Sequence, residues 1–166
     1  PNDAPVETPE IEGNWKKETF SLAGKIYELM ADYKVLEDDG WLIKEKSDKT
    51  LKANEKLYLE VELEHEKYKD SKVIVGLVND KQEESKYKDC KYWAIRVSND
   101  WSETPIEFSL PGGVEYGSTV KEVEKVYGKP KEDGIYCYDI SEVLLTVAIQ
   151  SSYNGSTKHP YVEGVN

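Results

Sequence analysis

Histidine and cysteine, the residues that most often carry out chemistry, are few in this chain and widely separated. His65 and His159 belong to no HExxH motif and to no histidine pair at helical spacing, and no GxSxG sequence is present. His65 falls on the apolar side of a predicted strand, which favours a structural histidine over a ligand. Cys90 and Cys137 form no CxxC pair, so neither a zinc site nor a thioredoxin-type site is indicated. The two cysteines form either one disulfide or two buried thiols, and we favour the thiols.

Carboxylates are abundant, and four of them occupy alternate positions of one predicted strand: Glu60, Glu62, Glu64 and Glu66. Two carboxylates can hydrolyse a glycosidic bond, but nothing marks two of these as unlike in burial, which that chemistry needs. The ladder also lacks the tight loop and mixed oxygen ligands of a calcium site, which favours a solvated face. The glycines before Ser118 and Thr119 lack the lysine of a phosphate-binding loop, so these two residues fit a helix cap better. We therefore predict no catalytic residues, no metal and no cofactor.

The composition restricts the class of partner. The chain has 166 residues, 33% of them charged, and a net charge of −11, which disfavours nucleic acid and an anionic membrane surface. Twelve tyrosines and four tryptophans stand against two phenylalanines, a usage typical of half-exposed sheet faces and contact surfaces. No apolar run is long enough for a membrane span or a signal core. The acidic, proline-containing residues 1–12 are typical of a flexible tether.

One short sequence occurs twice. Phe20-Ser21-Leu22-Ala23-Gly24 returns as Phe108-Ser109-Leu110-Pro111-Gly112, and the same offset (108 − 20 = 88) carries Val35 onto Val123 and Gly40 onto Gly128. A repeat of this kind predicts two tandem units that are built alike. We divide the chain into a flexible acidic tether (1–18), a first unit (19–107) and a second, shorter unit (108–166).

Hydrophobic periodicity and turn signals predict a short helical element and about three antiparallel strands in each unit. In the first unit we expect a helix over 33–39, with Asp32 as its N-cap and Gly40 in the left-handed position after it. In the second unit, Thr119 and Glu122 form a capping box and Gly128 ends the helix. Strands are expected at 19–22, 57–66, 72–79, 92–98, 135–140 and 143–150. The strand at 72–79 is apolar on both faces and should be central, and Trp93 of the strand at 92–98 should face inward. This pattern predicts an α+β fold.

If each strand turns its apolar side toward the helices, a tyrosine-rich face is left pointing outward. Its residues are Tyr58, Glu60, Glu62, Tyr92, Arg96, Tyr136 and Tyr138. Tyrosine with scattered charge is typical of recognition surfaces, and an ordinary wet sheet face has the same pattern. The two interpretations weigh equally, because a register slip of one residue reverses every assignment. The candidate ligand-binding residues are Tyr58, Tyr92, Arg96, Trp101, Tyr136 and Tyr138.

The segment from Phe108 to Pro130 (FSLPGGVEYGSTVKEVEKVYGKP) resembles the pattern G-S/T-x-x-E-V-x-x-x-Y/L-G-x-P of Gram-positive surface lipoproteins. It is also similar to outer-membrane lipoproteins of the SmpA/OmlA type and to the repeat unit of β-lactamase inhibitor proteins. The resemblance implies helical elements on antiparallel sheets, which tandem copies join into one concave surface. It further implies a non-catalytic, extracytoplasmic module that binds a protein or a cell-wall polymer and is lipid-anchored in its full-length precursor. Inhibition of a β-lactamase does not carry over, because a fold does not fix a function.

Two other functions stay open from the sequence. A loop over 99–105 that carries Trp101 could plug the active site of a secreted enzyme, which would make the chain an inhibitor. Two carboxylates facing each other in a closed cleft would instead indicate a wall-degrading enzyme. Neither the ligand nor the oligomeric state follows from the sequence.

Overall fold

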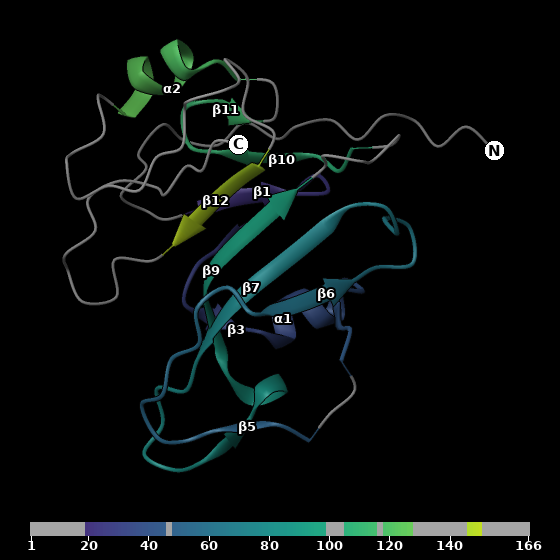
Figure 1. The fold of residues 1–166 in the computed structure, drawn as a ribbon, viewed down its shortest axis with the longest axis vertical. Coiled ribbons are helices and arrows are strands. Elements are labelled where there is room, and N and C mark those ends of the chain that lie inside the picture. The colour runs from purple at the N-terminus through teal and green to yellow at the C-terminus, as the bar shows by residue number, and fades with distance from the viewer. Residues whose placement is uncertain (1–18, 46–47, 99–104, 116–117, 128–145, 151–166) are drawn as a thin grey trace.

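The computed structural model describes residues 19–45, 48–98, 105–115, 118–127 and 146–150. These residues form mostly antiparallel strands and two short α-helices, arranged as two larger sheets and a two-stranded ribbon (Figure 1). The arrangement is compatible with the predicted α+β class, and far more of the described residues lie in strands than in helices. The predicted helix end at Gly128 and the predicted strand at 135–140 lie outside the described residues.

The smaller of the two main sheets has the strand order β11-β10-β1-β2. Its strands are β1 (Thr19–Leu22), β2 (Lys25–Glu28), β10 (Phe108–Leu110) and β11 (Val114–Glu115). β1 has the predicted bounds. Ala23 and Gly24 join it to β2 with φ angles of 52° and 83°. Two successive positive φ angles are the mark of a type I′ turn, whose twist matches that of a β-hairpin.

The two copies of the repeated sequence lie side by side in this sheet (Figure 1). β1 and β10 are antiparallel, and Ser21 lies directly opposite Ser109. Because these serines are equivalent positions of the repeat, the copies pair as they would about a twofold axis. The two serine Oγ atoms are 3.0 Å apart, and the ring centroids of Phe20 and Phe108 are 5.8 Å apart.

The larger sheet has the order β12-β9-β7-β6-β4, and β3 also pairs with β9. Its strands are β3 (Ala31–Asp32), β4 (Leu42–Ile43), β6 (Val61–Glu64), β7 (Lys72–Val78), β9 (Lys91–Ser98) and β12 (Thr146–Gln150). β7 is central, as predicted for 72–79. The strand predicted over 57–66 begins only at Val61. Leu57 and Leu59 pack on different hydrophobic clusters, so the chain before β6 does not alternate as a strand does.

A β-bulge at Trp93 decides which side chains of β9 face the core. Leu77 lies opposite Tyr92, and the preceding residue of β7, Gly76, lies opposite Ala94, which leaves Trp93 as the additional residue. Tyr92 therefore joins the core side, where it is fully buried. The predicted outward position of Tyr92 is wrong, and so is the predicted inward position of Trp93, which packs in a separate cluster with Ala94.

The two helices are α1 (Lys34–Asp38) and α2 (Val120–Tyr127). The N-cap of α1 is Tyr33, which makes no side-chain cap bond, so the predicted cap at Asp32 is wrong. Gly40 has a φ of 93°, the predicted left-handed conformation. The predicted capping box of α2 is confirmed. The Thr119 N–H donates to Glu122 Oε2 at 2.9 Å, and the Glu122 N–H donates to Thr119 Oγ1 at 3.2 Å.

One hydrophobic core joins the two main sheets and both helices. It contains Phe20, Leu22, Phe108 and Leu110 from the smaller sheet, Val73, Val75, Ile95 and Val97 from the larger sheet, and Leu36 and Val123 from the helices. The ribbon of β5 (Thr50–Leu51) and β8 (Ser85–Lys86) adds Leu51. Each main sheet contains strands from both 19–107 and 108–166, so both predicted ranges contribute to one core.

Candidate functional site

The larger sheet has one side against the core and one side away from it, which we call the outer face. Three neighbouring strands supply the row of the outer face formed by Glu62 on β6, Ile74 on β7 and Arg96 on β9. These residues lie directly opposite one another, and all three side chains are partly exposed. A carboxylate, an alkyl group and a guanidinium thus stand next to each other on a supported surface, a combination suited to recognition.

Trp93 covers one end of the outer face. A Cβ on Gly76 would come within 2.7 Å of the indole Nε1, so the ring lies directly over that glycine. The Nε1–H donates to the Leu57 carbonyl at 2.6 Å, and Lys56 Nζ lies 3.6 Å from the ring centroid. Tyr58 contacts Trp93 at a centroid distance of 5.7 Å and is 44% exposed. The fixed indole therefore holds Tyr58 toward solvent.

The other end of the outer face opens into a hollow over β4 and β6, which we call the β4–β6 groove. It has a volume of about 470 Å³, and its lining includes Leu42, Lys44, Glu64, His65, Glu66 and Tyr68. Leu42 lies opposite Glu64 in the sheet and is 49% exposed. Lys44 forms an ion pair of 3.2 Å with Glu62, so the groove continues into the row across the outer face.

The rings of His65 and Tyr68 form a wall of the groove, and Trp41 packs behind them. Trp41 is buried and stacks on Tyr68 with a centroid distance of 5.7 Å and an interplanar angle of 8°. The His65 ring lies 4.7 Å from Trp41 and 5.0 Å from Tyr68. A Cβ on Gly40 would come within 2.8 Å of His65 Nε2, so glycine is required where the chain leaves α1. The wall is therefore fixed by packing, and Tyr68 keeps part of its ring exposed.

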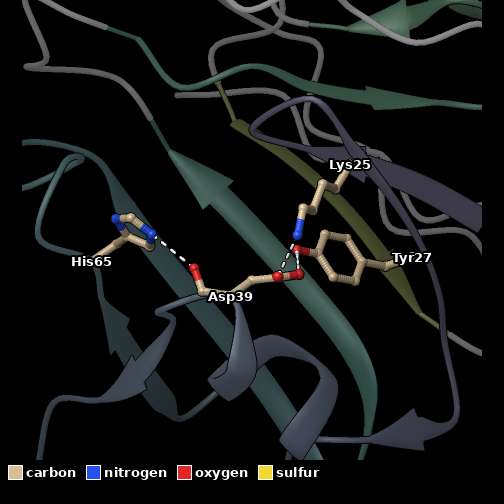
Figure 2. Close-up of polar contacts among 4 residues, drawn as sticks. All are labelled: Lys25, Tyr27, Asp39 and His65. Carbon is tan, nitrogen blue, oxygen red and sulfur yellow. Dashed lines mark hydrogen bonds and ion pairs between the residues drawn. The ribbon is translucent and has the colours of Figure 1, made fainter.

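Asp39 ties this wall to the smaller sheet (Figure 2). Its Oδ1 accepts a hydrogen bond from Lys25 Nζ, and its Oδ2 accepts one from the Tyr27 hydroxyl at 2.5 Å. Its main-chain oxygen lies 2.9 Å from His65 Nε2. The bonds from Lys25 and then Tyr27 lower the pKa of Asp39. Burial, reinforced by Asp39, raises the pKa of Tyr27 above its ordinary range.

These four residues include groups that can transfer protons, yet each is already engaged. The Lys67 N–H donates to His65 Nδ1 at 3.1 Å, so Nδ1 is the acceptor and Nε2 carries the hydrogen that Asp39 accepts. Both oxygens of the Asp39 carboxylate and both ring nitrogens of His65 are used within the fold. The cluster therefore holds β2, the end of α1 and the groove wall together, and His65 has the structural role that the sequence favours.

The structure separates the six residues predicted to bind a ligand. Tyr58 and Arg96 are exposed or partly exposed on the side away from the core. Tyr92 is a core residue whose hydroxyl donates to the Glu28 carbonyl at 2.7 Å, and burial raises its pKa. The other three, Trp101, Tyr136 and Tyr138, lie outside the described residues.

Sequence reasoning missed Leu42 and Tyr68, which shape the groove. Leu42 belongs to a run with Trp41 and Ile43 that reads as three apolar residues of one strand. The signal available in the sequence was the shortness of that run. A two-residue strand at the edge of a sheet, next to a helix, leaves one of its side chains exposed to solvent. Tyr68 follows the acidic ladder in a charged segment, where nothing in the sequence distinguishes it from a loop residue.

The described residues contain no group of three or more His, Cys, Asp or Glu side chains placed to hold a metal ion. No helix in this part of the chain is long and apolar enough to cross a membrane. Cys90 is a buried thiol whose Sγ–H donates to the Lys86 carbonyl at 3.3 Å, and burial raises its pKa to about 11; Cys137 lies outside the described residues. Comparison of the chain with known protein families, curated proteins and solved structures found no match.

Proposed function

We propose that this chain is a non-catalytic binding or assembly module that contacts a protein or a cell-wall polymer through the outer face of its larger sheet. The observation that carries the proposal is the row of Glu62, Ile74 and Arg96, with the exposed side chains of Leu42, opposite Glu64, and Tyr58, against Trp93, on the same side of the sheet. Apolar and charged groups alternate over this surface, and the buried strands beneath hold them in place. Surfaces of this mixture bind partners without requiring a catalytic set.

We further propose that the module consists of two related units. The twofold register of β1 and β10 supports this, because equivalent serines face each other. Gly24 and Gly112, which are equivalent in the repeat, have φ angles of 83° and 81°. Each copy also continues in the same order, from a hairpin to a short helix. The sequence resemblance to envelope lipoproteins supports an extracytoplasmic, lipid-anchored location for the full-length precursor.

Capture from a Gram-positive envelope extract tests the outer face. The test variant is Leu42→Ser/Tyr58→Ser. The control variant is Ile26→Ser/Val35→Ser, which removes two apolar side chains that are 51% and 45% exposed outside this face. The proposal predicts a captured partner that is lost with the first variant and retained with the second, with both variants melting as the parent does. Equal capture by both variants would contradict it.

A further inference from the structure

The geometry points to the β4–β6 groove as the docking site for a basic, partly apolar peptide segment of a partner protein. This inference rests on the proposed binding function and names the chemistry of the partner. It depends on three features of the groove, which are its charge, its apolar contacts and the way its outer edge is closed.

The charge of the groove favours a cation. Lys44 already neutralises Glu62. Glu64 and Glu66 are exposed, and neither forms an ion pair with another described residue. Lys69 is the remaining basic residue of the lining, so free carboxylates exceed free ammonium groups there, in a chain of net charge −11. A lysine or arginine side chain therefore finds complementary charge, whereas a polyanionic wall polymer would be repelled.

The apolar contacts favour a peptide over a small amine. Leu42 is half-exposed at the edge of the sheet, and covering it would remove apolar surface from water. Tyr68 offers a ring that is held against Trp41 on one side, and a cation over its exposed part gains a cation–π contact. Both residues line the same hollow as Glu64 and Glu66. One segment with a basic and an apolar side chain can thus use both kinds of contact.

The partner segment lies over the face of the sheet and does not extend it. At the free edge of β4, the Ile43 N–H donates to the Tyr33 hydroxyl at 3.1 Å, and that hydroxyl donates to the Trp41 carbonyl at 2.6 Å. Tyr33 is buried, so this edge is occupied by the chain itself. Strand addition, which needs free main-chain groups, is therefore disfavoured at β4.

The test is binding of a short labelled peptide in which lysine and leucine occupy alternate positions separated by serine, so that both point to one side when extended. We expect binding to the full chain that weakens as NaCl is raised from about 50 to about 300 mM. Glu64→Lys/Glu66→Lys should weaken it about tenfold or more, because two attractions become repulsions. A peptide with glutamate in place of lysine should not bind.

The matched control is Glu28→Lys/Glu83→Lys, which changes the net charge equally at two exposed glutamates outside the groove. Retained binding by the control supports the inference. Equal loss in both variants would show a non-specific charge effect and overturn it, as would no binding to the parent chain or equal binding of the acidic peptide. If the Leu42→Ser/Tyr58→Ser variant loses envelope capture but Glu64→Lys/Glu66→Lys leaves the peptide affinity unchanged, only this inference fails. If the Leu42→Ser/Tyr58→Ser variant captures the partner as well as the parent does, the proposed function fails.

Discussion

Glu107 holds the seam between the two copies of the repeat, and its truncation should destabilise the fold. Its Oε1 accepts from the Ser21 hydroxyl, and its Oε2 accepts from the Gly24 N–H at 2.7 Å. Its main-chain oxygen accepts from the Ala23 N–H at 2.8 Å. The residue just before the second copy thus fastens the turn of the first. Glu107→Ala keeps the main-chain bond and removes both carboxylate bonds.

The expected loss follows from those two bonds. A hydrogen bond to a charged group contributes about 1.5–3 kcal/mol, and a donor left unsatisfied when buried costs about 1–3 kcal/mol. Ser21 is fully buried but keeps Ser109 as a partner at 3.0 Å. Gly24 and Glu107 are partly exposed, so water replaces part of what is lost. We therefore expect Glu107→Ala to lower the free energy of unfolding by about 2–3 kcal/mol.

Urea unfolding followed by tryptophan fluorescence measures this loss, because Trp41 and Trp93 are buried. Glu107→Gln should fall between Ala and the parent, since its amide oxygen can serve one of the two donors. Glu115→Ala, an exposed glutamate on β11, is the control and should stay within about 0.5 kcal/mol of the parent. A Glu107→Ala variant as stable as Glu115→Ala would refute the role assigned to this carboxylate.

Three further changes test the fold. Ala23→Asn should raise the urea midpoint by the equivalent of about 0.5–1 kcal/mol, because asparagine before Gly24 suits two positive φ angles better than alanine. Gly76→Ala should cost about 2–3 kcal/mol and shift the tryptophan emission, because the new Cβ would lie 2.7 Å from Trp93 Nε1 and 3.0 Å from the Leu57 carbonyl. Stability should also fall above about pH 10, by up to about 1.4 kcal/mol per pH unit for each buried tyrosine that ionises only on unfolding. Burial raises the pKa of three such tyrosines, Tyr27, Tyr33 and Tyr92. Their stabilisation is complete below the unfolded pKa and is lost above it, so urea midpoints should decline from about pH 10 upward, less steeply in Tyr27→Phe.

Local sequence signals correctly predicted the elements in which local preferences and packing favour the same structure. The segment 72–79 is apolar on both faces, which predicted a central strand, and β7 is central. The Thr119–Glu122 capping box and the positive φ of Gly40 also follow from side-chain chemistry within a few residues. Cap preferences and turn conformations are local, so one sequence suffices to predict them.

The orientation of Tyr92 could not be predicted, because it depends on a bulge. One additional residue at Trp93 reverses the alternation, so that Tyr92 enters the core and Trp93 leaves it. The bulge belongs to the pairing of β9 with β7, and β9 also pairs with β3 and β12, which lie far from it in the sequence. The groove has the same origin. Leu42 and Tyr68 line the same groove although they belong to different segments. The end of α1, the edge strand β4 and the turn after β6 are held together by the contacts of His65 with Asp39 and Trp41.

The residues that stabilise the seam between the two copies of the repeat are different from the residues that we propose to bind the peptide. Phe20 and Phe108 enter the core from the smaller sheet, and Glu107 fastens the seam beside them. Glu64 and Glu66 belong to the groove at the far edge of the larger sheet, and Glu107 bonds to neither of them. Effects of substitutions that are distant and share no partner add independently. Glu107→Ala should therefore weaken the fold while the folded molecules bind the basic peptide as before, and Glu64→Lys/Glu66→Lys should do the reverse. A substitution at the seam that altered peptide affinity in fully folded protein would show that the core transmits strain between the sheets, and the two copies would then belong to the binding mechanism as well as to its support.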